Sequence, residues 1–284
     1  RLGGSQAARR MTAAGRGKVA YVPEEFWEER YSRLDLTRSG HRDLPEAYNR
    51  WLYRRKQSVL RRTLAQAGFT VRGQRVLEVG IGIGAYLDFW RGLGAREVCG
   101  TDLSATAIAE LNRRHPGGRF ERSDVTAPGA MSDFGRFRLV TALDVLYHVV
   151  DDARLSQALA NIRARLEPGG LFVFHDQFLH RPAVDRGYIR WRSLADWQQL
   201  LARAGFEIVA RRPIFFTMIQ ANDGTPERLV RADARWAQLM PWIVRFPSAM
   251  GALLSRIDGW LASTRDDGPS MELMIARPTI GGPR

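Results

Sequence analysis

The feature that most constrains the fold is an alternation of short apolar runs with amphipathic segments between Arg75 and Phe178. Five runs read as strands, and segments with apolar residues at helical spacing separate them. Strands and helices that alternate in this way form a mostly parallel sheet with helices on both faces, which is the α/β class. The predicted strands are Arg75–Val79, Glu97–Thr101, Gly118–Arg122, Leu139–Leu143 and Leu171–His175.

The segments on either side extend this core. Residues 21–70 have an aromatic, helical pattern that predicts an N-terminal helical cap, and residues 71–284 are expected to form the α/β domain. Within that domain, residues 225–264 are expected to be a helical lid of two helices, broken around Pro241 to Pro247. This insertion precedes a final strand predicted over Met271–Arg277.

Composition and hydropathy exclude several classes of protein. Apolar residues make up 45% and charged residues 26% of the 284 residues, as in an ordinary globular chain. No apolar run reaches the length of about 18 residues that a membrane span needs. Residues 1–20 lack the apolar core of a secretory signal and are expected to be a disordered arm or a remnant of cloning. We therefore expect a cytoplasmic protein with no membrane partner, whose oligomeric state no pattern reveals.

The net charge of +13 comes almost entirely from arginine, because all but two of the 43 basic residues are arginines. They are spread along the chain without a basic cluster interleaved with aromatic residues, so nucleic-acid binding is the weaker interpretation of the charge. Cys99 is the only cysteine, and the five histidines show no metal-ligand spacing. The sequence therefore predicts no metal site.

A glycine-rich turn follows the first predicted strand, where Gly80, Gly82 and Gly84 alternate with isoleucines after Glu78. Glycine lets the backbone approach a ligand closely because it has no Cβ atom. The same turn also fits the dinucleotide fingerprint with Ala85 in third place. An NADP-dependent oxidoreductase is therefore an alternative that this segment leaves open.

Two acidic residues come at or just beyond the ends of the next two predicted strands. Asp102 lies 22 residues beyond Gly80, where its carboxylate can accept hydrogen bonds from both hydroxyls of a ribose. Asp124 follows the third strand, where it can accept the amino group of an adenine. Glu78 is expected to add a third negative charge, which suits a cationic sulfonium better than a diphosphate. The three acids together favour a positively charged nucleoside as cofactor.

With these residues the chain resembles the class I S-adenosylmethionine-dependent methyltransferases of the small-molecule type. The resemblance covers roughly residues 70–180 and the final strand. It implies a Rossmann-like sheet of seven strands, the last of them antiparallel, and S-adenosylmethionine as cofactor. The motifs that carry it read Glu78-x-Gly80-x-Gly82-x-Gly84, Thr101-Asp102-Leu103-Ser104, Ser123-Asp124-Val125, Leu143-Asp144-Val145-Leu146-Tyr147-His148-Val149 and Leu166-Glu167-Pro168-Gly169-Gly170.

By that resemblance the cofactor lies across the carboxyl ends of the first strands, with the three glycines under its methionine and ribose. Asp102 would bind the ribose hydroxyls, and Leu103 would pack on the adenine face. Asp124 and the backbone of Val125 would contact the adenine edge. The backbone around Leu143 would face the methionine moiety.

The resemblance also suggests a further cofactor contact, Tyr31, because similar enzymes fold an N-terminal segment over the cofactor. His148 is the first candidate for a general base, since an imidazole accepts protons near neutral pH. His175, beside Asp176 at the end of the fifth strand, is the second candidate. For each histidine the structural alternative is a ring that only bonds its neighbours.

Seven of the eight tryptophans lie outside residues 75–178, which favours an enclosed aromatic pocket over an open groove. We therefore expect a small-molecule acceptor, such as a secondary metabolite, methylated on oxygen, nitrogen or carbon. An RNA-modifying methyltransferase is the alternative that the net charge supports.

Overall fold

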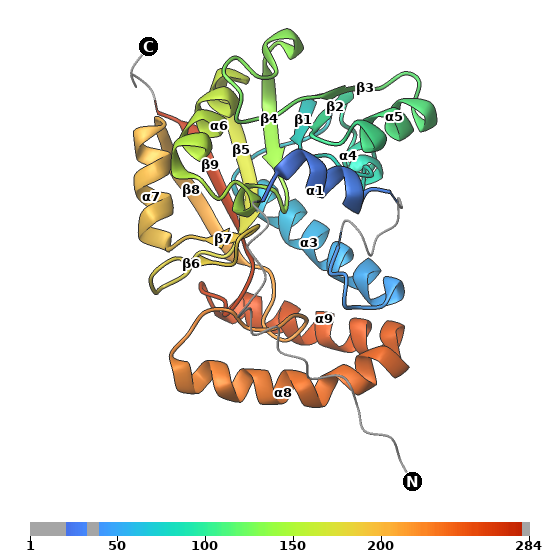
Figure 1. The fold of residues 1–284 in the computed structure, drawn as a ribbon, viewed down its shortest axis with the longest axis vertical. Coiled ribbons are helices and arrows are strands. Elements are labelled where there is room, and N and C mark those ends of the chain that lie inside the picture. The colour runs from blue at the N-terminus through green and yellow to red at the C-terminus, as the bar shows by residue number, and fades with distance from the viewer. Residues whose placement is uncertain (1–20, 33–39, 280–284) are drawn as a thin grey trace.

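The computed structural model describes residues 21–32 and 40–279 (Figure 1). The expectation of a disordered arm at residues 1–20 lies outside these ranges. The described chain is built around a seven-stranded sheet in the order β3-β2-β1-β4-β5-β9-β8. The strands are β1 (Arg75–Val79), β2 (Glu97–Asp102), β3 (Arg119–Arg122), β4 (Phe137–Ala142), β5 (Leu166–Asp176), β8 (Phe206–Pro213) and β9 (Glu272–Pro278).

The direction of the strands confirms the predicted class. The pairs from β3 through β5 are parallel, whereas β9 runs antiparallel to both β5 and β8. β9, the last strand in the described ranges, therefore lies between β5 and β8, and both of these strands run in the direction opposite to its own. This is the mostly parallel, Rossmann-like sheet with an antiparallel last strand that the sequence predicts.

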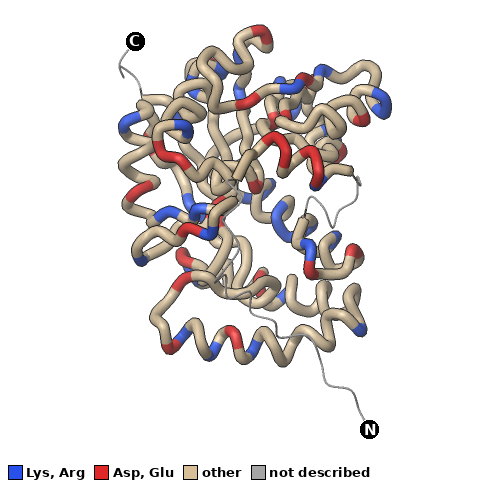
Figure 2. The backbone as a smooth tube through the Cα atoms, in the orientation of Figure 1, with Lys and Arg blue, Asp and Glu red and all other residues tan. Residues whose placement is uncertain are grey.

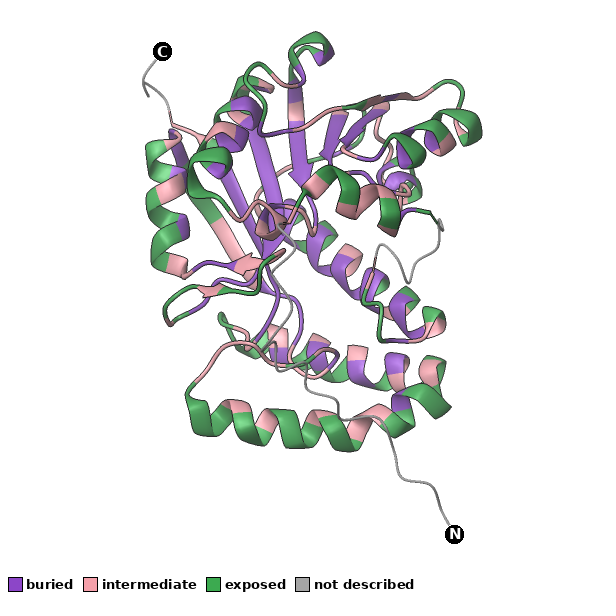
Figure 3. Cartoon of the chain, viewed as in Figure 1, coloured by how far each residue is buried: buried purple, intermediate pink, exposed green. Residues whose placement is uncertain are grey.

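Both faces of the sheet are apolar because successive strand residues point to opposite sides. In β1, for example, Val76 belongs to one buried cluster and Leu77 to the other. The cluster of Val76 contains residues of α3 (Glu46–Gln66), α4 (Leu87–Gly92) and α5 (Ala105–Arg114). The cluster of Leu77 contains residues of α6 (Asp152–Ala164) and α7 (Leu194–Arg203). Figure 3 shows the purple, buried strands between these helices.

Helix starts follow the capping residues that the sequence contains. The Ser104 hydroxyl accepts a hydrogen bond from the Ala107 backbone at 3.1 Å, as its position before α5 predicts. Ser193 and Asp196 form a capping box at the start of α7. These local signals were sufficient because a cap depends on only three or four consecutive residues.

Several boundaries differ from the sequence prediction. β5 begins at Leu166, so the predicted Pro168-Gly169-Gly170 turn lies inside the strand, where the register with β4 shifts. β8 ends at Pro213, and the residues between it and α8 (Pro226–Arg245) form no further strand of the sheet. A short ribbon of β6 (Val184–Asp185) and β7 (Arg190–Trp191) was not predicted. Two 3-10 turns, η1 (Ser132–Phe134) and η2 (Leu146–His148), flank β4.

The cap and the insertion are helical, as predicted, with α1 (Pro23–Arg30) in the cap and α8 (Pro226–Arg245) and α9 (Pro247–Thr264) in the insertion. The two helices meet at Phe246, within the break predicted around Pro241 to Pro247, and α8 continues through Pro241 itself. Pro241 and the residue one turn before it, Ala237, are both exposed, so water can bind the carbonyl that the proline frees. No helix in the described ranges is long and apolar enough to cross a membrane.

The insertion is attached to α3 and to the segment after β8. α9 packs along α3, as Figure 1 shows, and α8 lies on the outer side of α9. The buried Asp258 of α9 accepts hydrogen bonds from the backbone of Phe216 and Thr217 at 2.9 and 2.8 Å. Its backbone carbonyl in turn accepts one from Arg55 Nη2 at 3.0 Å. These polar contacts fix the insertion in place.

We predict that Asp258→Ala lowers the free energy of unfolding by about 3 kcal/mol, because it leaves several buried N–H groups without an acceptor. Asp233→Ala on α8 is the matched control, since Asp233 is exposed and accepts one hydrogen bond, from Gln220. That change should cost no more than about 0.5 kcal/mol. Urea unfolding measures both values, and equal costs for the two variants would contradict the anchoring role of Asp258.

Candidate active site

A cleft that is partly open to solvent lies at the carboxyl ends of the central strands. It is lined by the segments that follow β1, β2, β3 and β4, and α1 and the residues beside it cover it. The sequence-predicted residues that line it are Tyr31, Glu78, Gly80, Gly82, Asp102, Leu103, Asp124, Val125, Leu143 and His148. Gly84 and His175 are not among the lining residues.

The three glycines of the turn after β1 all have positive φ angles, of 69°, 54° and 77°. A Cβ atom on Gly80 would lie 2.4 Å from Val145, and one on Gly82 would lie 2.5 Å from the Tyr31 hydroxyl. The backbone therefore passes through a gap that a side chain would fill. Gly84 instead faces Leu111 of α5, at 2.8 Å from a notional Cβ, so its absent side chain serves helix packing.

Asp102 joins the end of β2 to the glycine turn. Its two carboxylate oxygens accept hydrogen bonds from the backbone of Gly82 at 2.8 Å and of Ser104 at 2.9 Å. Each oxygen keeps a second lone pair, which is what a ribose hydroxyl requires. Burial raises the pKa of Asp102 to about 6, and the backbone hydrogen bonds oppose this shift. At neutral pH the carboxylate is therefore mostly ionised.

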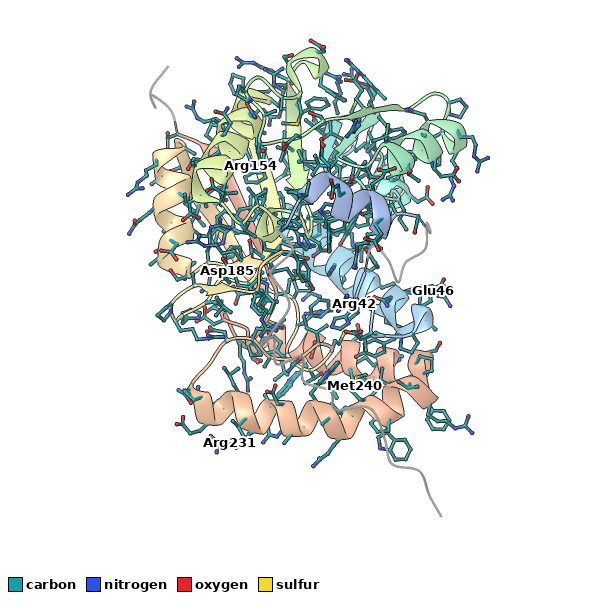
Figure 4. All side chains as sticks on the ribbon, viewed as in Figure 1. Arg42, Glu46, Arg154, Asp185, Arg231 and Met240 are labelled. Atoms are coloured by element: carbon teal, nitrogen blue, oxygen red, sulfur yellow. The ribbon has the colours of Figure 1, made fainter. Side chains whose placement is uncertain are left out.

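Asp124 has a partner that the sequence did not reveal. Arg154 of α6 donates a hydrogen bond to its Oδ2 at 2.8 Å, and Thr126 donates two to Oδ1. Arg154, labelled in Figure 4, also lines the cleft. The neighbouring backbone N–H of Val125 makes no hydrogen bond with any described residue. A free donor beside a carboxylate matches the edge of an adenine.

Glu78 is fully enclosed, and its environment changes the electrostatic expectation. Burial raises its pKa to about 8, because the hydrogen bond from Trp90 Nε1 at 2.8 Å only partly offsets the loss of solvent. The nearby carboxylates of Asp144 and Asp102 raise it further. At neutral pH Glu78 is thus mainly protonated, and the third negative charge expected from the sequence is absent unless a cation binds beside it.

Asp144 supplies a charge at the base of the cleft that the sequence did not assign. It follows Leu143 with a left-handed φ of 64°, and its Oδ2 accepts a hydrogen bond from Lys56 Nζ of α3 at 2.5 Å. Burial alone would raise the pKa of Asp144, but Lys56 and His175 lower it well below its usual value. Asp144 therefore stays ionised.

His175 lies behind this pair rather than in the cleft. Its side chain has no solvent exposure, and its Nδ1 lies 3.6 Å from Asp144 Oδ1. Burial lowers its pKa, although Asp144 acts in the opposite direction. In this position His175 cannot touch an acceptor in the cleft. It can influence the site only through its interaction with Asp144.

His148 stands at the wall of the cleft with a defined tautomer. Its Nδ1 lies 2.9 Å from the backbone carbonyl of Tyr188, which can only accept a hydrogen bond, so Nδ1 carries the proton. Nε2 then keeps its lone pair and has no partner among the described residues. Burial lowers the pKa of His148 to about 4, so the ring is neutral at pH 7. This differs from the pKa near 6.5 that a free imidazole suggests.

Aromatic residues of the N-terminal cap cover the cleft. Trp27 stacks on Tyr31 with ring centres 5.6 Å apart and meets the His148 ring edge-on at 4.8 Å. Glu28 holds α1 to the start of α5, where it accepts hydrogen bonds from the Ser104 hydroxyl at 2.8 Å and from the Thr106 backbone at 3.2 Å. The cleft is therefore closed on this side by an attached helix.

Sequence reasoning missed residues that approach the cleft from distant segments. Lys56, Arg154 and Tyr86 belong to this group, and no short motif connects them with the residues they face. The sequence does contain one signal for Lys56, because this residue interrupts the apolar stripe of α3 formed by residues such as Leu52 and Leu60. A single cation on a buried helix face predicts a buried anion as partner.

The insertion does not line the cleft in this structure. None of the described residues of α8 or α9 is among those that surround it. α9 packs against α3 instead, and α8 packs on the outer side of α9. A lid role for residues 225–264 remains a prediction.

Comparison with known proteins agrees with the geometry of the cleft. A family model described as "Methyltransferase domain" matches residues 48–211, which is more than half of the chain. Among solved structures, the DhpI–SAH complex is 19% identical, with a TM-score of 0.52 and coverage of 92% of this chain and 96% of the other. A putative sarcosine dimethylglycine methyltransferase from Galdieria sulphuraria is 15% identical, with a TM-score of 0.52 and coverage of 79% and 84%.

The curated relatives match a shorter part of the chain. A ubiquinone biosynthesis O-methyltransferase from Albidiferax ferrireducens is 35% identical over 109 residues, covering 37% of this chain and 41% of the relative. The protein of the same name from Ralstonia nicotianae is 32% identical over 127 residues, covering 44% and 51%. The chain thus spans about half or less of the length of these relatives. With the match over residues 48–211, the glycine turn and the acids at the strand ends, the chain belongs to the class I S-adenosylmethionine-dependent methyltransferase family.

Proposed function

We propose that this protein transfers the methyl group of S-adenosylmethionine to a small molecule in the cytoplasm. The observation that carries the proposal is the closure of the cleft by the aromatic residues of α1 and its surroundings, among them Trp27 and Tyr31. A cleft that aromatic residues cover on one side suits a compact acceptor better than a polymer. Because the curated relatives are named O-methyltransferases, oxygen is the acceptor atom that we favour.

The residues present fit the cofactor. The gap over Gly82, the ionised Asp102 and the free N–H of Val125 lie along one side of the cleft, in the order turn, ribose and adenine. Asp124 would bind the adenine amino group, either beside Arg154 or after that side chain moves away. When bound, S-adenosylmethionine supplies a methyl group on a positively charged sulfur that leaves as a neutral thioether.

The buried hydroxyl of Tyr86 supports binding of the methionine end. It lines the cleft and has no hydrogen-bond partner among the described residues. Asp144 also lines the cleft, and its Oδ1 makes no hydrogen bond with a described residue, since His175 Nδ1 lies 3.6 Å away. Unpaired buried polar groups are costly, so a polar ligand that pairs with them gains affinity. The amino-acid group of the cofactor has the donors and acceptors for both.

His148 is the residue that we propose as general base. Its Nε2 lone pair is available, and the Tyr188 carbonyl fixes the ring orientation. In the reaction Nε2 would take the proton that an acceptor hydroxyl loses as its oxygen bonds the methyl carbon. His175 would act only by stabilising Asp144, since it does not reach the cleft.

The net charge of +13 supports a competing proposal, an RNA-modifying methyltransferase. Ionic strength separates the two, because affinity for RNA falls steeply as salt rises whereas turnover of an uncharged small molecule does not. An NADP-dependent oxidoreductase is no longer an alternative, since the family match assigns the glycine turn to a methyltransferase domain.

We predict that Asp102→Ala lowers the affinity for S-adenosylmethionine by a factor of about 10 to 100, equivalent to about 1–3 kcal/mol. The physical reason is the loss of the acceptor for the ribose hydroxyls. Asp88→Ala, at an exposed position on α4, is the matched control and should bind normally. Titration calorimetry measures both affinities, and thermal unfolding checks that the glycine turn remains folded. Unchanged affinity in a folded Asp102→Ala variant would place the ribose elsewhere.

We predict that His148→Ala lowers turnover by ~10²–10⁴ at saturating cofactor, with cofactor affinity preserved. His115→Ala, on a ring outside the cleft, should have little effect. Wild-type turnover should stay level through the range where a free imidazole titrates, because the folded ring has a pKa of about 4. Below that pH the protonated ring can no longer accept a proton, and turnover should fall.

Saturating cofactor matters in this measurement, because Asp102 has a pKa of about 6 and its protonation would weaken binding. The acid limb near pH 4 should be missing from His148→Ala. A variant that turns over at a near-normal rate would rule out the base, and methyl transfer by positioning alone would remain.

A further inference from the structure

The exposed large apolar side chains of the described residues are concentrated on the helical hairpin formed by α8 and α9. Ten such side chains occur among the described residues, and seven of them lie on α8, α9 and the turn between them. Trp242 and Trp260 are the most conspicuous, with 59% and 66% of their surfaces exposed. We call this set the hairpin surface: Val230, Trp242, Val244, Phe246, Leu253, Ile257 and Trp260.

The outer side of α8 is apolar in a regular pattern. Val230, Ala234, Ala237, Pro241 and Val244 follow one another at alternating spacings of four and three residues, and all five are exposed. This spacing places them along one stripe of the helix. The stripe continues into a shallow groove beside Met240 and Arg245. The outer stripe therefore has no partner in the described fold.

The inner side of α8, in contrast, packs against the rest of the fold. Trp236, Leu239 and Met240 pack against the buried cluster of α3 and the sheet, and Ile243 is fully buried. Figure 4 shows Met240 on the side of α8 that faces α9 and Arg231 on the opposite, outer side. One side of this helix thus serves the fold, and the other is left for a different contact.

The hairpin also carries cations without partners. It has five arginines, all exposed, and none of them forms an ion pair with a residue in the described ranges. The Arg245 guanidinium lies over the Phe246 ring at 5.3 Å. Figure 2 shows blue arginine positions along the outer helix. The five are Arg228, Arg231, Arg235, Arg245 and Arg256.

The three acids of the hairpin offset only part of the charge of its five arginines. Asp258 is buried and bound to backbone N–H groups, and Asp233 accepts a hydrogen bond from Gln220. Glu227 stands at the first turn of α8, where the helix dipole favours a negative charge. The hairpin surface therefore combines apolar and aromatic side chains with unpaired positive charge.

Charge decides which occupant fits this surface. A second copy of the chain would bring the same five arginines against themselves. Residues 1–20 contain five basic residues and no acid, so they do not complement it either. The partner must be anionic and must also accept exposed tryptophans and an aliphatic stripe. Nucleic acid meets the first requirement, but it offers nothing to the stripe of Val230 and Val244.

We propose that the hairpin surface binds the surface of an anionic phospholipid bilayer. Tryptophan rings favour the headgroup level of a bilayer, and aliphatic side chains of an amphipathic helix enter the acyl boundary beside it. The arginines bind the phosphate groups of the lipids. This attachment lies on the surface and requires no membrane-spanning helix, and it departs from the expectation that the protein has no membrane partner.

Flotation of the full-length protein with lipid vesicles tests the proposal independently of methyl transfer. We expect binding to phosphatidylcholine vesicles that contain phosphatidylglycerol, and much weaker binding to phosphatidylcholine alone or at high salt. Arg231→Gln combined with Arg245→Gln should lower the partition coefficient by about tenfold or more. Trp242→Ser combined with Trp260→Ser should lower it by a similar factor.

Matched controls lie outside the hairpin. Ile208→Ser replaces an apolar side chain of β8 that is 37% exposed, and Arg96→Gln removes an exposed arginine before β2. Both should bind vesicles like the wild type, and circular dichroism should show that every variant is folded. The arginine variant decides the question if the tryptophan variant does not fold.

Three results would overturn the proposal. The first is equal binding to vesicles with and without phosphatidylglycerol, and the second is unchanged binding in both hairpin variants. The third is absence of vesicle binding together with a dimer that the tryptophan substitutions dissociate, which would assign the surface to a second copy.

Discussion

The reversal of strand order between β1 and β4 is the constraint on which the candidate site depends. Because β2 flanks β1 on one side and β4 flanks it on the other, the chain leaves the ends of β1 and β4 in different directions. A crevice opens at such a point in any parallel sheet of this kind. The turn after β1 must then pass between Val145 and Tyr31, and only residues without a Cβ atom fit there, as Gly80 and Gly82 do.

A buried ion pair sets the charge at the base of that crevice. Lys56 reaches Asp144 from α3, and removal of one partner from such a pair costs about 3–5 kcal/mol because the other charge is left uncompensated. The pair keeps Asp144 ionised, and the charge of Asp144 helps to keep Glu78 protonated. The crevice therefore holds ionised and neutral carboxyl groups side by side. A bound cation would change this balance, since it favours the ionised form of Glu78.

The parts of the fold that the sequence predicts are those with local signals. Strand positions follow from apolar runs, and the start of α5 follows from Ser104, since both depend on a few consecutive residues. The position of Gly80, Asp102 and Asp124 in one cleft was predictable for a similar reason: each stands at a strand end, and parallel strands bring those ends together.

The remaining features depend on contacts between distant segments. Lys56 and Asp144 are 88 residues apart, and no sequence pattern near either residue indicates that the other is its partner. The pKa of His148 near 4 could not be read from the sequence, because it depends on how completely neighbouring segments enclose the ring. The exact end of α8 also depends on its surroundings, because the exposed position of Pro241 lets water bind the carbonyl that this proline frees, and the helix continues to Arg245.

Helix α3 connects the cleft with the hairpin surface through two adjacent residues. Lys56 bonds Asp144 at the base of the cleft, while Arg55 bonds the Asp258 carbonyl of α9 and the Ile214 carbonyl after β8. Both side chains are buried, and each satisfies acceptors that would otherwise be unpaired. Because one rigid helix carries both contacts, the orientation of α9 is fixed relative to the cleft. A protein that binds a lipid surface through this hairpin would thus present its cleft at a constant angle to that surface.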